Sequence, residues 1–193
     1  EYRGSIQAIT IAEGVTSIGE HAFSYCSSLT AITIPESVTS IGDYAFWDCD
    51  SLTDLTLSES VTSIGEYAFS SCSSLAAITI SESVTSIGNN AFSSCSSLAA
   101  ITISENVTSI GRAAFCYCSS LTSIVVAEGN TVYDSRGGCN AIIETNSNTL
   151  IQGCYTTIIH EDVTSIEIGA FAGCAALTSI TIPESVKNIG SYA

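Results

Sequence analysis

One stretch decides the fold: Leu29-Thr-Ala-Ile-Thr-Ile-Pro-Glu-Ser-Val-Thr-Ser-Ile-Gly-Asp-Tyr-Ala-Phe-Trp-Asp-Cys-Asp-Ser51, which the chain then repeats. Leucines recur 23 residues apart, at Leu29, Leu52, Leu75, Leu98 and Leu121. All six phenylalanines share one column of the repeat, at Phe23, Phe46, Phe69, Phe92, Phe115 and Phe171. A fixed period of this length predicts a solenoid, in which each coil buries its apolar side chains against neighbouring coils.

Each unit carries signals for two short strands and a turn. Ile32-Thr33-Ile34 has the alternation and the β-branched residues of a strand, and residues 38–41 form a second such segment. Gly42 recurs in nearly every unit, which suggests a turn with an unusual backbone angle. Residues 43–49 are long enough for a single helical turn. Stacking the units should therefore give parallel ladders of short strands.

Composition excludes several classes of partner. The chain has four Lys and Arg residues against nineteen Asp and Glu, for a net charge of −15. Nucleic acids and anionic membrane surfaces attract basic proteins, so neither is expected as a partner. No apolar run approaches the roughly 18 residues that a transmembrane helix needs. Both ends break off inside a repeat, so we expect a piece of a longer protein, and residues 1–193 should form one repeat domain.

Nine cysteines at first suggest a disulfide framework, but most of them follow the repeat. The cysteine column comprises Cys26, Cys49, Cys72, Cys95, Cys118 and Cys174. Such a column is most simply a buried ladder of small residues. Successive coils lie about 4.8 Å apart, which exceeds the Cβ separation of about 3.8 Å that disulfides prefer. We therefore expect free thiols along the column.

The repeat resembles the BspA-like leucine-rich repeats, whose unit is LxxIxIPxxVxxIGxxAFxxC. The match extends over almost the whole chain, and its second half is specific, as in Ala45-Phe46-Trp47-Asp48-Cys49. The resemblance implies a right-handed, curved leucine-rich-repeat solenoid of about eight coils of 23 residues. It also implies a surface protein of a bacterium or protist, often linked to adhesion, with no inherited catalytic residues.

One unit is irregular, because residues 121–153 are longer than the normal repeat. Residues 139–154 contain two apolar segments around Asn146-Ser147, which predicts a β-hairpin. That register places Ile142 opposite Ile151 and Cys139 opposite Cys154. Two interpretations stay open: an ordinary hairpin that replaces one turn of the solenoid, or a hairpin closed by a Cys139–Cys154 disulfide. Similar inserts with YDSR and CNAIIET segments occur in the resembling family.

No constellation of residues indicates catalysis. The two histidines, His21 and His160, occupy different repeat positions, and no metal-binding, nucleophile-elbow or phosphate-loop motif is present. We therefore predict a protein that is not an enzyme and that needs no metal or cofactor. A column of glutamates, one in nearly every coil, could bind calcium, but one carboxylate in each coil is a poor ligand set. Solvated side chains are the preferred interpretation of that column.

The second unit differs most from the others, and it supplies the candidate binding surface. It contains the only tryptophan beside tyrosine and aspartates. The candidate residues are Asp43, Tyr44, Trp47, Asp48, Asp54 and Tyr67. Exposed Trp and Tyr are favoured anchors in protein interfaces. The alternative is that Trp47 only covers the phenylalanine column from outside.

Two functions are therefore open. The chain could be a non-catalytic, extracellular or cell-surface module for protein interaction or adhesion, binding a host or matrix protein or a glycan. It could instead be a passive spacer that holds another domain away from the cell. The decoration of the second unit favours binding, whereas residues 75–99, which are mostly Ser, Ala, Ile and Thr, favour the spacer.

Overall fold

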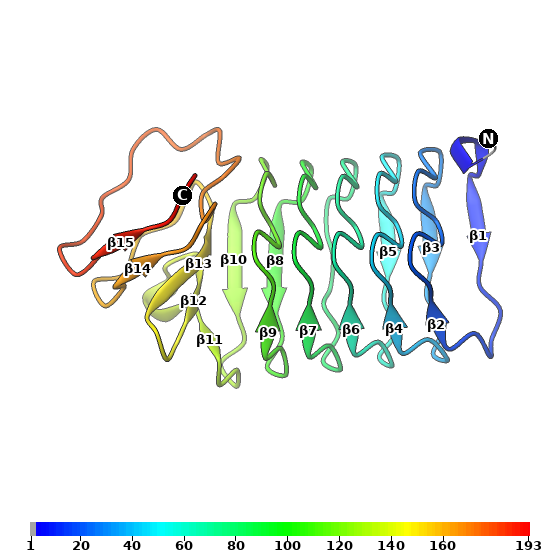
Figure 1. Ribbon diagram of the computed structural model, residues 1–193, viewed down its shortest axis with the longest axis horizontal. Helices are drawn as coiled ribbons and strands as arrows, with labels where there is room; N and C mark the ends of the chain where they lie inside the picture. Colours follow the sequence, from blue (N-terminus) through cyan, green and yellow to red (C-terminus); the bar gives the residue numbers. More distant parts are fainter. Residues whose placement is uncertain (1–2) are drawn as a thin grey trace.

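The computed structural model describes residues 3–193, except that the side chain of Asp54 lies outside that description. Short strands stack side by side along one long axis, with one coil for each repeat (Figure 1). The result is a β-solenoid of about eight coils with parallel strands and almost no helix, as the 23-residue period predicts. A short 3-10 turn, η1 (Arg3–Ser5), precedes the first strand.

The first strand of each coil builds one face of the solenoid. β1 (Ala8–Thr10), β3 (Ala31–Thr33) and β5 (Asp54–Thr56) form a parallel sheet, and β8 (Ala100–Ile103) pairs in parallel with β10 (Ser123–Val126). A single bridge between Ala77 and Ala100 connects the intervening coil. Partners are one repeat apart, so equivalent side chains stack. In β3 the central Ile32 is buried while its two neighbours are exposed.

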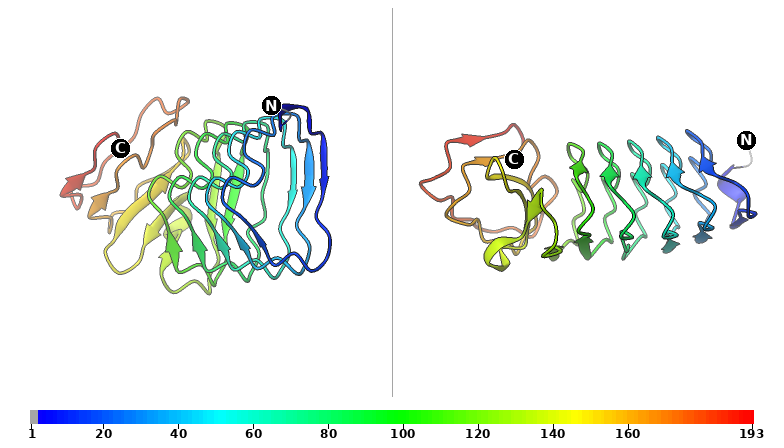
Figure 2. Two further views of the ribbon diagram at one scale, coloured as in Figure 1. Left: turned by 45° about the vertical axis from the view of Figure 1, so that its right-hand side comes forward. Right: turned by 90° about the horizontal axis from the view of Figure 1, so that it is seen from below.

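The second strand of each coil builds another parallel sheet. Its five members are β2 (Ser17–Ile18), β4 (Ser40–Ile41), β6 (Ser63–Ile64), β7 (Ser86–Ile87) and β9 (Ser109–Ile110). In each pair serine lies opposite serine and isoleucine opposite isoleucine. Figure 2 shows these coils lying in nearly the same orientation from the N-terminal end to β9.

The phenylalanine column forms the centre of the core, as predicted. Phe69 is fully buried, and its ring stacks on Phe46 and Phe92 in the adjacent coils, with centroids 5.1 Å and 5.4 Å apart. Buried leucine, isoleucine and valine columns surround this stack. Each coil therefore obtains its core contacts from the two coils beside it.

The cysteine column is buried except for Cys174, which is half-buried, and all nine cysteines are free thiols. From Cys49 to Cys118, each thiol of the column also donates a hydrogen bond to the carbonyl oxygen of a phenylalanine in the preceding coil, which the repeat pattern alone did not predict. The Sγ atom of Cys72 donates to the carbonyl oxygen of Phe46 at 3.3 Å, and Cys95 donates to Phe69 at 3.2 Å. Burial raises the pKa of the Cys49 thiol to about 12. These four thiols thus fill space in the core, and each satisfies a backbone acceptor in the preceding coil.

The expectation of an unusual backbone angle at the recurrent glycine is wrong. Gly42, Gly65, Gly88 and Gly111 are not among the glycines with positive φ. Instead, a Cβ on Gly88 would lie 2.5 Å from the carbonyl carbon of Gly65, and similar clashes occur at the other three. Glycine is needed because the backbones of successive coils touch at this point.

The segment 43–49 makes two tight turns where a single helical turn was expected. Ala45 N–H donates to the Gly42 carbonyl and Trp47 N–H to the Tyr44 carbonyl, so each is a four-residue turn closed between its first and fourth residues. Tyr44 and Asp48 have φ values of 56° and 62°, in the left-handed region. These left-handed residues interrupt the helical geometry in every regular coil.

The lengthened repeat contains a hairpin and then resumes the array. The sheet order is β11 (Tyr133–Asp134), β12 (Ala141–Glu144), β13 (Thr149–Gly153), β14 (Ser165–Ile166) and β15 (Asn188–Ile189). A 3-10 turn, η2 (Arg136–Gly138), precedes β12. β12 and β13 are antiparallel, and β13, β14 and β15 are parallel.

The hairpin register follows the prediction only near the turn. Glu144 pairs with Thr149, but a bulge after Ile142 shifts the pairing, so Ile142 lies opposite Gln152 and not opposite Ile151. Cys139 and Cys154 are both free, so the disulfide interpretation does not hold in this structure. The Cys154 thiol donates to the Asn140 carbonyl at 3.6 Å.

Residues 127–153 of the lengthened repeat, which we call the insert, close the edges of both preceding sheets with side chains. The regular ladders end at β9 and β10, whose outward N–H groups would otherwise lack a strand partner. Three side-chain oxygens accept them: Tyr133 Oη from Ile110, Asn140 Oδ1 from Ile124, and Ser135 Oγ from Val126, at 2.9, 3.0 and 2.9 Å. We call this boundary, with β9 and β10 on one side and the insert on the other, the seam.

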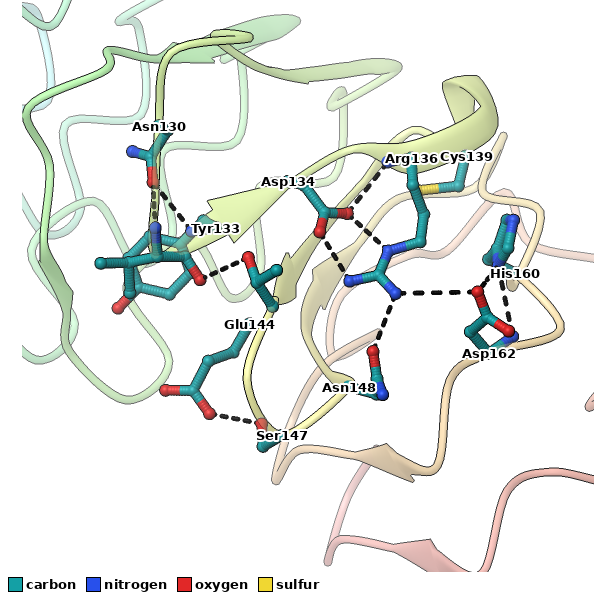
Figure 3. Close-up of polar contacts among 12 residues, drawn as sticks. Asn130, Tyr133, Asp134, Arg136, Cys139, Glu144, Ser147, Asn148, His160 and Asp162 are labelled. Carbon is teal, nitrogen blue, oxygen red and sulfur yellow. Dashed lines mark hydrogen bonds and ion pairs between the residues drawn. The ribbon is translucent and has the colours of Figure 1, made fainter.

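A polar cluster stabilises the insert beyond the seam (Figure 3). Arg136 contacts Asp134 at 2.6 Å and donates to Asn148 Oδ1 at 2.8 Å, and its guanidinium lies 3.9 Å from Asp162. Burial alone would raise the pKa of Asp134, but hydrogen bonds from Arg136 outweigh it and lower that pKa. The cluster therefore joins the hairpin to the loop before β14.

Candidate interaction surface: an aromatic cluster on the first three coils

Five aromatic side chains meet on the outside of the first three coils. We call His21, Tyr25, Tyr44, Trp47 and Tyr67 the aromatic cluster. His21, Tyr44 and Tyr67 form a nearly parallel stack, with ring centroids 4.7 Å and 4.9 Å apart. Trp47 lies beside this stack, 4.8 Å from the ring of Tyr25 and 5.6 Å from that of Tyr44. The cluster is one continuous surface.

The backbone holds the stacked rings at this spacing. Tyr44 N–H donates to the Glu66 carbonyl at 2.8 Å, and His21 N–H donates to the Asp43 carbonyl at 2.9 Å. The residues that carry the stacked rings have left-handed backbone conformations, with φ values of 55°, 56° and 53° at His21, Tyr44 and Tyr67. Such conformations cost roughly 1 kcal/mol or more for residues with a side chain. Hydrogen bonds between the coils therefore hold these residues in backbone conformations that are unfavourable in isolation.

Sequence reasoning found three of the five rings. Tyr44, Trp47 and Tyr67 were predicted, while His21 and Tyr25 were not. The missed pair occupies the same repeat columns one unit earlier, as Tyr44 and Asp48 do in the second unit. The spacing of one repeat places side chains of one column in contact, so the columns themselves held the signal.

The predicted aspartates play different parts. Asp43 Oδ1 accepts the N–H of Glu66 at 2.7 Å, so this carboxylate helps to hold adjacent coils together. Asp48 lies in the same turn as Trp47 and is half-buried. Asp54 begins β5, in the sheet formed by the first strands, and its side chain lies outside the described part of the structure.

Trp47 is half-buried, and its ring contacts the rings of Tyr25, Tyr44 and His21. The phenylalanine rings stack on one another inside the coils. Trp47 therefore belongs to an outer aromatic layer that is separate from the phenylalanine stack.

The cluster lies in a negative environment. Partial burial raises the pKa of Tyr44, and the nearby Tyr67, Glu66, Asp43 and Glu20 raise it further. Burial also raises the pKa of Asp48, with an additional contribution from Asp50. Each shift has carboxylates among its causes, so negative charge accumulates on this face.

A cavity of about 590 Å³ opens beside the seam. It is lined by Glu66, Asn89, Asn90, Ile110, Gly111, Arg112, Ile151 and Glu167. Glu167 N–H donates to the Leu150 carbonyl as Gly42 N–H donates to the Ile18 carbonyl, so Ile151 and Glu167 stand in the glycine column. In the regular coils the backbones touch at the glycine column. Here the larger side chains of Ile151 and Glu167 occupy that column, and both line the cavity.

Each of the two histidines lies near a single carboxylate. His21 Nε2 lies 3.8 Å from Glu20, and His160 Nδ1 lies 3.5 Å from Asp162. Across residues 3–193, no group of three or more His, Cys, Asp or Glu side chains is placed to hold a metal ion. The glutamates of the repeated column are exposed, namely Glu13, Glu36, Glu59, Glu82, Glu105, Glu161 and Glu184. No helix in this part of the chain is long and apolar enough to cross a membrane.

Comparison with protein families identifies the repeat. The BspA type leucine rich repeat region matches residues 1–134 and 144–193, in six copies. The chain belongs to this family. The gap between the matched ranges falls within the irregular repeat, where η2 and the start of β12 depart from the regular coil. Comparison with curated protein sequences finds no match.

Solved structures of leucine-rich repeat proteins share the fold. A leucine-rich repeat protein from Eubacterium ventriosum is 28% identical with a TM-score of 0.86, over 98% of this chain and 51% of that one. One from Bacteroides ovatus is 30% identical with a TM-score of 0.73, over 96% and 48%. A leucine rich cell surface protein from Faecalibacterium prausnitzii is 28% identical with a TM-score of 0.51, over 96% and 65%. This BspA-type chain thus spans about half the length of the first two.

Proposed function

We propose that this chain is a non-catalytic interaction module of a cell-surface protein, which recognises a protein or glycan partner through the aromatic cluster. The observation that carries the proposal is the gathering of five aromatic rings on the outside of three coils. Large aromatic side chains at a surface are favoured anchors for binding. A leucine-rich cell surface protein among the similar structures supports the location.

Membership in the BspA-type family supports a binding role, because repeat solenoids offer extended, rigid surfaces. This family and fold are typically non-catalytic.

A passive spacer is the second candidate function. Residues 75–99 support it, because their outward side chains are mostly Ser, Ala and Thr. A spacer needs regular stacking, but it does not need five aromatic rings in contact.

A retention experiment with a matched pair of variants tests the two functions. The chain is passed over immobilised extracellular-matrix proteins and glycans, and the variants Tyr25→Ala and Tyr117→Ala are compared. Both tyrosines are exposed and left-handed, with φ values of 63° and 61° and exposed fractions of 48% and 57%, but only Tyr25 belongs to the cluster. The binding proposal predicts retention that Tyr25→Ala weakens and Tyr117→Ala does not. Retention on none of the surfaces supports the spacer.

A further inference from the structure

The aromatic cluster is bordered by carboxylates on two sides. Glu20, Asp43 and Glu66 immediately precede the three stacked rings, and we call them the acidic row. Since successive coils lie about 4.8 Å apart, the row places three carboxylates along one line. The Glu20 side chain is 70% exposed. Asp48 and Asp50 lie in the same turn as Trp47 or just after it.

Among residues 3–193, the acidic row has one ion-pair contact, from His21 Nε2 to Glu20 at 3.8 Å, which is an ion pair only when His21 is protonated. Arg3 lies at the N-terminal end of the cluster, but its Nη1 donates to the carbonyl oxygens of His21 and Ser24 at 2.9 and 3.1 Å. That guanidinium is engaged with the backbone of the turn. Carboxylates held side by side repel one another, so a cationic ligand would gain by relieving the repulsion.

The acidic row ends where the aromatic stack ends. In the next two coils its positions are taken by Asn89 and Arg112, and the ring column continues with Asn90 and Ala113. The aromatic and acidic features therefore occupy the same three coils. A ligand that uses both has its footprint on coils one to three.

The ring geometry distinguishes between the two classes of partner. Saccharides stack their apolar faces on an open aromatic face. In this stack both faces of Tyr44 are covered, because its ring is nearly parallel to His21 at 18° and to Tyr67 at 10°. Outward groups are ring edges, phenolic hydroxyls and neighbouring carboxylates. Hydroxyl and carboxylate oxygens accept hydrogen bonds from ammonium and guanidinium groups.

We propose that the aromatic cluster and the acidic row bind a segment of a partner protein that is rich in arginine and lysine. Its cationic groups donate hydrogen bonds to the carboxylates of Glu20 and Glu66 and to the phenolic hydroxyls beside them. The net charge of −15 attracts such a segment at long range. This inference rests on the proposed binding function and narrows it to one chemical class.

The only tryptophan lies inside the site, so its fluorescence reports binding directly. The probe is a peptide of alternating arginine and glycine, and its control is the same peptide with citrulline, which keeps the shape of arginine without the charge. Neutral cello- and chito-oligosaccharides form the third arm. Glu20→Gln with Glu66→Gln removes two charges while Asp43 keeps its hydrogen bond. The matched control is Glu59→Gln with Glu82→Gln, in the exposed column after the first strand.

The arginine peptide should change the Trp47 emission, and the citrulline peptide should not. The first double variant should weaken binding about tenfold, and raising salt from about 20 to 500 mM should weaken it comparably, since exposed ion pairs are screened. The control variant should leave the affinity within about twofold. Equal binding of both peptides, binding of a saccharide alone, binding of nothing, or equal weakening by both double variants overturns the inference. Retention on a matrix protein that depends on Tyr25 but resists competition by the arginine peptide also overturns it, while the proposed function stands.

Discussion

Replacing Gly88 by alanine should destabilise the solenoid by about 2–3 kcal/mol. The new Cβ would lie 2.5 Å from the carbonyl carbon of Gly65 and 2.6 Å from the backbone nitrogen of Glu66. Carbon atoms prefer about 3.5–4.0 Å, so the two coils must separate by roughly 1 Å. The hydrogen bond from Gly88 N–H to the Ile64 carbonyl, now 2.8 Å, cannot survive that separation.

The magnitude combines three effects. Overpacking costs about 1–3 kcal/mol, and a lost backbone hydrogen bond costs about 1 kcal/mol. Alanine recovers about 0.5–1 kcal/mol by restricting the unfolded chain. Gly19 is the matched control, because it stands in the same column but a Cβ added there would have nothing within 4 Å. Gly19→Ala should therefore be neutral or slightly stabilising.

Urea unfolding followed by circular dichroism measures both variants against the parent chain. The difference between their urea midpoints, multiplied by the dependence of the unfolding free energy on urea concentration, gives the difference in the free energy of unfolding. If Gly88→Ala unfolds within about 0.5 kcal/mol of Gly19→Ala, close approach between coils is not the reason for the glycine column.

Further predictions test the core, the seam and the thiols. Phe69→Ala should cost about 3–5 kcal/mol in urea unfolding, and Trp47→Ala less than half of that, because Trp47 is only half-buried; equal costs would place Trp47 in the core. Tyr133→Phe removes the acceptor of the Ile110 N–H and should cost about 1–2 kcal/mol; an unchanged midpoint would contradict an edge-closing role. Burial raises the pKa of Cys49 from 9.0 to about 12, so the folded chain keeps a proton that the unfolded chain releases. Stability should therefore fall as pH rises from 9.0 to about 12, and less steeply in Cys49→Ala. Thermal unfolding should be unaffected by EDTA or mild reductant; a drop with EDTA would reveal a structural metal, and a drop with reductant a disulfide.

The repeat period determined most of the fold in advance. Because Phe46, Phe69 and Phe92 are 23 residues apart, stacking and burial of their rings follow from the sequence alone. The same period could not tell why Gly42 recurs. Unusual backbone angle and close approach both favour glycine, and only the separation between neighbouring coils distinguishes them.

Only part of the aromatic cluster was predicted, because contacts between neighbouring coils decide its membership. Trp47 and Tyr44 were predicted because the second unit contains the only tryptophan, with a tyrosine nearby. His21 enters the cluster only through stacking of its ring on Tyr44 in the next coil. The hairpin shows another limit. Its turn set the register correctly at Glu144 and Thr149, but a bulge, which leaves little trace in a single sequence, moved the register farther on.

The seam has a consequence for how the array responds to force. Buried side chains form two separate clusters: one runs through the coils up to the insert, and the other includes Ile143, Leu150 and Val163 beyond it. The N–H groups on the near side already have side-chain acceptors from the insert. Because the C-terminal coils have a core of their own, we expect them to extend first when the chain is pulled from its ends. The parallel sheet of β2, β4, β6, β7 and β9 should then stay paired. The aromatic cluster, at the far end of that ladder, would keep its shape while the other end of the molecule lengthens.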